Sequence, residues 1–322
     1  MKRRTLMAGG LGWGAGWGVS LGLGVPLLSA CESGDDEATG TLRIATGSKG
    51  AVYYTYGSAI AELAKRYLPN VTASVLPTNA SKENVDSVLN GAADVGFTQA
   101  DIAGDGDKAA PGQLAALARI YDDYVHLVVA RGGGINTVQD LRGRRVSVGQ
   151  KGSGTAVTAD HILEVAEGGL RDAIIAQPLS LNESVEALRK NEIDAFFFSG
   201  GLAVGLIQEL AQTFAIQLVG LETLVQKLRA KFGDYYAERI VPASAYAGIS
   251  PTVAIGIANY LVVRVSMPEP LAYGVTRLLF EGRDELAKAH QAAARLNIRS
   301  AISTPPLPLH PGAVRYYRAQ KA

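Results

Sequence analysis

The sequence has few of the residues that build metal centres and covalent cross-links. Its 322 residues include one cysteine and four histidines, which excludes an intrachain disulfide and a cysteine-based zinc site. The histidines are too scattered along the chain for metal-ligand spacing: His126, His161, His290 and His310. We therefore expect no bound metal, and nothing in the sequence indicates a cofactor.

An excess of charge of one sign is also lacking. The chain has 31 basic and 30 acidic side chains, for a net charge of +1. No stretch combines clustered Lys and Arg with interleaved aromatic residues, as a nucleic-acid surface requires. Glycine is common, at 37 residues, but has no period that would indicate collagen-like structure. Nucleic acid is therefore not an expected partner.

Motifs for nucleotide binding and hydrolysis are missing too. The turn around Lys49 lacks P-loop spacing, and Gly152-Ser153-Gly154 does not continue into a dinucleotide-binding motif. No serine lies in a G-x-S-x-G motif, and His126 falls in an apolar, strand-like run where a core histidine is expected. We therefore expect a protein that is not an enzyme.

The first 30 residues are typical of an export signal. Lys2, Arg3 and Arg4 come first, no acidic residue follows, and positions 5–30 are uncharged. Eight glycines between positions 9 and 24 disfavour a permanent membrane helix. The Arg3-Arg4 pair fits twin-arginine export and leaves the ordinary secretory route open.

The segment ends in Leu28-Ser29-Ala30-Cys31, which resembles the site where bacterial lipoproteins are cleaved and acylated. We predict a signal peptide over 1–30, lipidation of Cys31 and an acidic, flexible tether over 31–40. The mature protein is then periplasmic and attached to a membrane through its lipid anchor only.

The rest of the chain repeats a pattern of strand, turn and helix. A strand at 42–46, a turn at 47–50 and a helix at 54–66 are followed by similar units near 71–90, 145–167 and 195–212. This alternation predicts parallel βαβ units in an α/β fold. Each turn brings glycine and hydroxyl residues to a helix N-terminus, where the helix dipole favours an anion.

The turns and motifs, in this order, resemble the TAXI family of solute-binding proteins, which serve TRAP transporters. The resemblance runs from about residue 42 to the C-terminus. It is carried by Ala45-Thr46-Gly47-Ser48, Tyr53-Tyr54, Ser81 with Asn84, Gly91-Ala92-Ala93-Asp94, the segment 140–149, Gly152-Ser153-Gly154-Thr155, Ile193-Asp194-Ala195, Gly200-Gly201 and the closing segment 306–313.

The resemblance implies a two-lobed, type II periplasmic-binding-protein fold, each lobe a mostly parallel sheet flanked by helices. The two hinge crossings are expected near 131–134 and 248–251. Lobe 1 would comprise 41–131 and 251–322, and lobe 2 would comprise 132–250. The implied ligand-binding residues are Thr46, Gly47, Ser48, Lys49, Tyr53, Ser81, Gln99, Gly152, Ser153, Gly154, Thr155 and Gly200.

The resemblance also implies a function. The protein would act as a monomer that captures a small organic anion, either a glutamate-like amino acid or a dicarboxylate, for a TRAP-type membrane permease. Lys49 stands where the family tends to have a small residue, and we expect it to contact the negative charge of the ligand. A receptor that feeds a sensor kinase or chemoreceptor is an alternative that the sequence leaves open.

Overall fold

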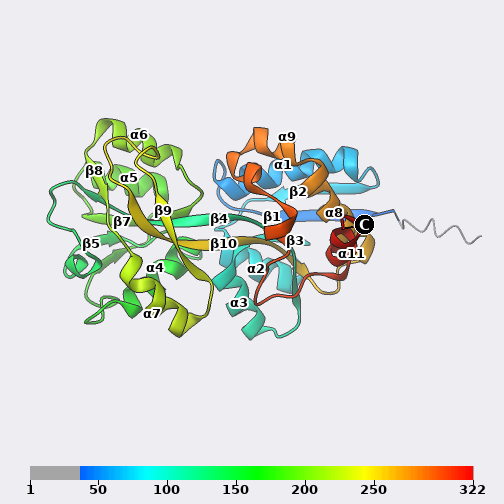
Figure 1. Ribbon diagram of the computed structural model, residues 1–322, viewed down its shortest axis with the longest axis horizontal. Coiled ribbons are helices and arrows are strands. Elements are labelled where there is room, and N and C mark those ends of the chain that lie inside the picture. Colours follow the sequence, from blue (N-terminus) through cyan, green and yellow to red (C-terminus); the bar gives the residue numbers. More distant parts are fainter. Residues whose placement is uncertain (1–36, 322) are drawn as a thin grey trace, which may run out of the picture. The chain divides into compact units, whose positions relative to one another are not determined.

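The structure is a computed structural model that describes residues 37–321. The expected signal peptide, Cys31 and positions 31–36 of the tether lie outside these residues. The described chain forms one mixed sheet of ten strands, in the order β2-β1-β3-β10-β4-β7-β5-β6, with β8 paired to β4 and β9 paired to β10 (Figure 1).

Each half of the sheet is built from the same unit, in which two helices alternate with three parallel strands. In lobe 1 the unit is β1 (Gly40–Ala45), α1 (Val52–Tyr67), β2 (Val71–Leu76), α2 (Ser81–Asn90) and β3 (Val95–Gln99). In lobe 2 it is β5 (Arg145–Ser147), α4 (Gly154–Val165), β6 (Ile175–Gln177), α5 (Leu181–Arg189) and β7 (Ala195–Gly200).

The same ion pair fastens the first strand to the third in both units. Arg43 Nη2 donates to Asp94 at 2.8 Å in lobe 1, and the backbone N–H of Arg43 donates to the same carboxylate at 2.7 Å. In lobe 2, Arg145 and Asp194 make the same two contacts at 2.8 Å each. The motifs around Asp94 and Asp194 therefore have a structural role, because they fix the ends of β3 and β7 relative to their neighbours.

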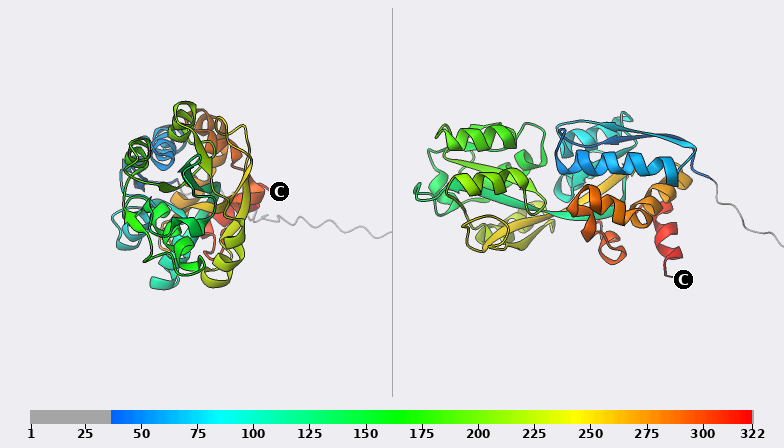
Figure 2. Two further views of the ribbon diagram at one scale, coloured as in Figure 1. Left: turned by 90° about the vertical axis from the view of Figure 1, so that its left-hand side faces the viewer. Right: turned by 90° about the horizontal axis from the view of Figure 1, so that it is seen from above.

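Two long antiparallel strands connect the lobes, β4 (Leu114–Ala130) and β10 (Thr252–Arg264) (Figure 2). Strand β10 pairs with β9 through Ile257 and with β3 from Asn259 onwards. Strand β4 pairs with β7 only from Tyr124 onwards.

The crossings therefore lie inside these strands. The sequence had led us to expect them in the turns at 131–134 and 248–251. The glycine run at 132–134 forms a turn beyond the end of β4. The expectation failed because it assumed that a flexible loop makes the crossing. A pair of hydrogen-bonded strands makes it instead.

Helices cover both faces of the sheet (Figure 1). The elements not yet named are α3 (Ala100–Ala109), α6 (Gly205–Thr213), β8 (Ile216–Leu218), α7 (Glu222–Phe232), β9 (Tyr236–Val241), α8 (Glu269–Glu281), α9 (Arg283–Ala289), α10 (Ile298–Ala301), α11 (Pro311–Ala319) and the 3-10 turns Val138–Leu141 and Gln291–Arg295. Among residues 37–321, no helix is both long and apolar enough to cross a bilayer.

The hydrophobic core is continuous between the lobes on one face of the sheet only. One cluster includes Val85 of α2, Ile102 of α3, Ile162 of α4 and Leu224 of α7, so it spans both lobes. On the other side, separate clusters lie beneath α1 and α8 in lobe 1 and beneath α5 and α6 in lobe 2. This break in the core leaves room for a cleft.

Candidate ligand-binding cleft

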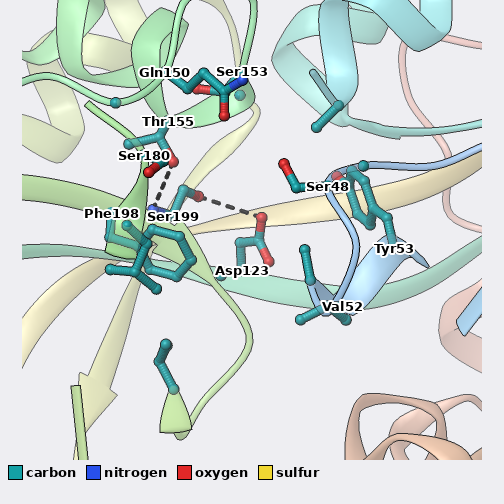
Figure 3. A pocket seen from close by; sticks show the side chains of 18 of the residues that line it. Ser48, Val52, Tyr53, Asp123, Gln150, Ser153, Thr155, Ser180, Phe198 and Ser199 are labelled. Carbon is teal, nitrogen blue, oxygen red and sulfur yellow. Dashed lines mark hydrogen bonds between the residues drawn. The ribbon is translucent and has the colours of Figure 1, made fainter. Parts of the chain in front are cut away.

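A cavity of about 550 Å³ lies between the two lobes (Figure 3). It collects the last residues of β3 and β7, the residues that follow β1, β2, β5, β6 and β7, and the first residues of α1, α2, α4, α5 and α6. The carboxyl ends of parallel strands are the usual ligand site of open α/β sheets. The repeated unit explains why both lobes contribute matching turns, since each lobe directs the same edge of its sheet at the cavity.

Most of the residues predicted from the sequence line this cavity: Gly47, Ser48, Lys49, Tyr53, Ser81, Gln99, Ser153, Gly154, Thr155 and Gly200. Thr46 does not, because its hydroxyl is fully buried and donates to the carbonyl of Leu76 at 2.9 Å across β1 and β2. Gly152 does not either. It has a φ of +83° and lies beside Asn79, in a turn that favours glycine.

Polar side chains from both lobes meet at the floor of the cavity. Gln99 Nε2 donates to Asp123 Oδ2 at 2.9 Å and to the hydroxyl of Ser199 at 2.5 Å. The Ser199 hydroxyl donates to the same Asp123 oxygen at 3.3 Å, and the Ser199 N–H donates to Thr155 Oγ1 at 3.0 Å (Figure 3). Gln99 is on β3 and Ser199 on β7, so this network joins the lobes across the hinge strand that carries Asp123.

A second part of the floor is built on the other hinge strand. The hydroxyl of Tyr53 donates to Asn259 Oδ1 and lies 3.3 Å from Ser81 Oγ. Burial raises the pKa of the Tyr53 hydroxyl well above its usual value, so this group stays protonated at neutral pH. Asn259 and Asp123 lie where β10 and β4 pass from one lobe to the other. The hinge strands thus provide the base of the cavity.

Three buried polar atoms in this network have no hydrogen-bond partner within residues 37–321: Asp123 Oδ1, Gln99 Oε1 and Asn259 Nδ2. Their side chains belong to residues that are at most 4% exposed. A buried polar group without a partner costs about 1–3 kcal/mol, so folded proteins rarely leave one unless it has a use. Asp123 is the most informative of the three residues, because it lines the cavity and its carboxyl group can carry a full negative charge.

Burial of the carboxyl raises the pKa of Asp123 to about 7. Hydrogen bonds from Gln99 and Ser199 act in the opposite direction. Asn259 also lies close enough to lower the pKa, although its Nδ2 completes no hydrogen bond with the carboxylate. At neutral pH, Asp123 is therefore divided between its protonated and charged forms, and a nearby cation would favour the charged one.

Glycine is required at two positions where the lobes and side chains meet closely. A Cβ at position 154 would lie 2.1 Å from Gln99 Oε1 and 3.0 Å from Ser81 Oγ, so α4 begins in direct contact with lobe 1. A Cβ at position 200 would lie 2.6 Å from the ring of Phe198, which folds back over it. These glycines allow a close approach that a larger residue would permit only if the neighbouring side chains shifted.

The helix N-termini differ in how their first N–H groups are satisfied. The hydroxyls of Ser153 and Ser180 cap α4 and α5. At α1 and α2 the capping positions are Ala51 and Ala80, and neither provides a side-chain cap. The N-termini of α1 and α2 therefore present N–H groups and the positive end of the dipole to the cavity, which favours a carboxylate there.

Several lining residues were not found from the sequence. Asp123 is the most important, and the signal was visible, since Asp122 and Asp123 interrupt an apolar strand. Asn79 and Gln150 were also missed. Gln150 Nε2 donates to Asn79 Oδ1 at 2.5 Å and so closes one side of the cavity between the lobes.

His126 is a core histidine, as expected. It is 1% exposed, and its two ring nitrogens lie 2.8 Å from the carbonyl oxygen of Tyr124 and 2.8 Å from the hydroxyl of Tyr246. Within the described part of the chain, no cluster of three or more His, Cys, Asp and Glu side chains is placed to hold a metal ion.

The family model that matches this chain decides its membership, because it covers residues 44–320 and is described as the NMT1-like family. The chain belongs to the NMT1-like family. The matched range contains both halves of the sheet and every residue that lines the cleft. The TAXI resemblance is more specific than this membership and stays a prediction.

Solved structures similar to this NMT1-like chain share its fold at low sequence identity. A Xanthomonas citri protein bound to ATP has a TM-score of 0.55 at 11% identity, over 87% of this chain and 94% of that one. A structure from Listeria monocytogenes assigned to an L-cystine ABC transporter has a TM-score of 0.53 at 16% identity, over 79% and 95%.

A Bordetella bronchiseptica RB50 protein has a TM-score of 0.51 at 18% identity, over 87% of this chain and 89% of that one. The expected fold is confirmed as an α/β periplasmic-binding-protein fold, with a mixed sheet and flanking helices.

Proposed function

We propose that this protein captures a small carboxylate that also carries an amino group and delivers it to a membrane permease. The observation that carries the proposal is the cleft itself, where both lobes direct helix N-termini and hydroxyls at one cavity above the buried carboxyl of Asp123. The carboxylate of the solute would lie at the uncapped starts of α1 and α2. Its amino group would meet Asp123 Oδ1, which has no other partner in the described chain.

This arrangement favours an amino acid over a dicarboxylate, the two ligand types that the family resemblance left open. A second carboxylate placed near Asp123 would face a buried group of the same charge. An ammonium group would pair with it instead. The proposed partner remains a TRAP-type permease, and the proposed location is the periplasm, with the protein attached to a membrane through a lipid on Cys31. The role is binding without chemistry, so the solute should be recovered unchanged.

The test is identification of the solute followed by titration. Mass spectrometry of the material that co-purifies with the exported protein should identify an amino acid, a compound that carries both an amino group and a carboxyl group. Calorimetric titration of that compound into the stripped protein should give one site per chain, and the compound should be intact after incubation. Tight binding of dicarboxylates with no binding of amino acids would contradict the role of Asp123, and conversion of the solute would contradict a binding function.

A further inference from the structure

The two ends of the cleft differ in chemistry. Polar groups gather at the floor, around Asp123 and Gln99. The wall toward lobe 2 is apolar and only half-buried, and it continues the hydrophobic core beneath α5 and α6. It consists of Leu179, Leu181, Phe198, Ala203, Val204 and Leu206, and Val52 of lobe 1 also lines the cavity. A contiguous apolar surface in a concave site is typical of a place where an apolar group binds.

The wall is held in shape by its own packing. The Phe198 ring lies over Gly200, where a Cβ would come within 2.6 Å of it, and the ring projects from β7 toward the cavity (Figure 3). Leu179 and Leu181 flank Ser180, the residue that caps α5 through its hydroxyl. These side chains are therefore positioned by a strand and a helix start, and they form a fixed surface.

Charged groups that would suit a second carboxylate are scarce in the cavity. Among residues 37–321, no arginine lines it, and the one lysine that does, Lys49, is exposed. His290 also lines it, but Nδ1 of its ring accepts the Ala292 N–H, and burial lowers its pKa, so it is neutral at pH 7. Glu209 lines the cavity as well and would repel an anion. Within residues 37–321, no cationic side chain is therefore matched to the side-chain carboxylate of glutamate at this end.

The size of the cavity agrees with a ligand that extends from the floor to this wall. Its 550 Å³ falls within the range of about 300–1,000 Å³ that is typical of small-molecule sites. An amino and a carboxyl group at the floor would leave most of that space to the rest of the solute.

We propose that the cleft is selective for hydrophobic amino acids, with side chains of the size of norleucine to phenylalanine, over glutamate. This inference rests on the proposed function, because the amino and carboxyl groups are assigned to the floor and the apolar side chain to the lobe 2 wall. Each buried methylene is expected to strengthen binding by about fourfold.

Calorimetric titration of the wild-type protein with L-alanine, L-norvaline, L-norleucine and L-glutamate tests the inference. We expect affinity to rise with each added methylene and glutamate to bind at least tenfold more weakly than norleucine. Glutamate binding as tightly as norleucine would overturn the inference and leave the proposed function standing. If none of the four amino acids binds, both are overturned.

A pair of variants locates the effect on the wall. Leu206→Asn changes a half-buried lining residue at the start of α6 and should weaken norleucine binding roughly tenfold more than alanine binding. Ile240→Asn changes a residue that is 64% exposed and outside the cavity, and should alter neither. An equal loss for alanine and norleucine in Leu206→Asn would contradict the assignment of the apolar wall. The ligand series on the wild-type protein decides the question even if this variant folds poorly.

Discussion

Asp123 combines a buried position with a raised pKa, and this has consequences for stability. Its pKa moves from 3.8 to about 7 on folding, so the folded state binds the proton more tightly than the unfolded state does. The contribution of Asp123 to the unfolding free energy therefore falls as pH rises from about 4 to about 7 and is constant above about pH 7. At 1.36 kcal/mol per pKa unit, the full effect is about 4 kcal/mol.

The variant Asp123→Asn should remove this dependence. The amide keeps an oxygen that can accept from Gln99 and Ser199 but never has to be charged. We expect the variant to be more stable than wild type by up to about 4 kcal/mol at pH 8, and the difference to shrink toward pH 4. Urea unfolding at pH 4.5, 6 and 8 measures it. Parallel pH profiles for the two proteins would show that Asp123 is not the group responsible.

Ligand affinity should depend on the same proton. An ammonium group pairs with the charged form of Asp123, so a proton must leave the carboxyl when the solute binds at acidic pH. Affinity should fall by about tenfold per pH unit below 7 and be constant between pH 7.5 and 8.5. Titrations in phosphate and Bis-Tris at pH 6 should differ in apparent enthalpy, because the released proton is taken up by buffers of different ionisation enthalpy. A flat affinity between pH 5 and 8 would contradict an amino group at Asp123.

Lys49 lies at the cavity but is exposed, which limits what it can contribute. An exposed charge pair is worth about 0.2–1 kcal/mol, so Lys49→Ala should weaken binding by no more than about fivefold, and high salt should abolish the difference. The matched control is Lys82→Ala, which removes an exposed lysine that pairs with Asp86 on α2 outside the cavity. Equal effects of the two variants would mean that Lys49 is an ordinary surface residue.

At the scale of elements, the start of α4 is the most constrained contact between the lobes. Gly154→Val should push Gln99 and Ser81 away, because a Cβ there would overlap the Gln99 side chain. Overpacking of this kind costs about 1–3 kcal/mol, which corresponds to a loss of affinity of about 5- to 150-fold.

Gly168→Val is the matched comparison. Gly168 lies after α4, outside the cavity, with a φ of +77°. A valine there is strained, so we expect a loss of stability of about 1–2 kcal/mol with unchanged affinity. Thermal unfolding and calorimetry on both variants separate the two effects. A similar loss of affinity in both would remove the reason to assign the Gly154 turn to the site.

The strand-turn-helix units were predictable because their hydrophobic periods and glycine turns are local features of the sequence. The turns at Gly47, Ser81 and Gly154 could be predicted because in each unit a turn connects the carboxyl end of a strand to the start of a helix. All three turns line the cavity. Thr46 was assigned wrongly to the cleft, since sequence does not reveal that a side chain at a strand end bonds across the sheet. The interruption of an apolar strand by Asp122 and Asp123 was visible, but the sequence could not place Asp123 close to Asn259, because their proximity depends on two strands separated by more than 100 residues.

At the scale of the whole described chain, the lobes are joined firmly on one side of the cleft. There the core is continuous from α2 and α3 to α4 and α7. A buried polar contact reinforces it, since the hydroxyl of Tyr236 donates to Asp101 of lobe 1 at 3.0 Å and lies 2.8 Å from His161 Nδ1. Across the cleft the lobes meet through a few polar contacts, such as those of Gln150 with Asn79 and of Gln99 with Ser199.

This asymmetry predicts how the protein moves. Opening should separate the polar contacts at the cleft, each worth about 0.5–1.5 kcal/mol, while the continuous apolar core acts as the pivot. Solution scattering should therefore give a smaller radius of gyration with saturating solute than without it. Gln150→Ala, which removes one contact between the lobes, should shift the solute-free protein further toward the open form. An unchanged radius of gyration at saturation would contradict a hinged receptor, because the solute would then bind without bringing the lobes together.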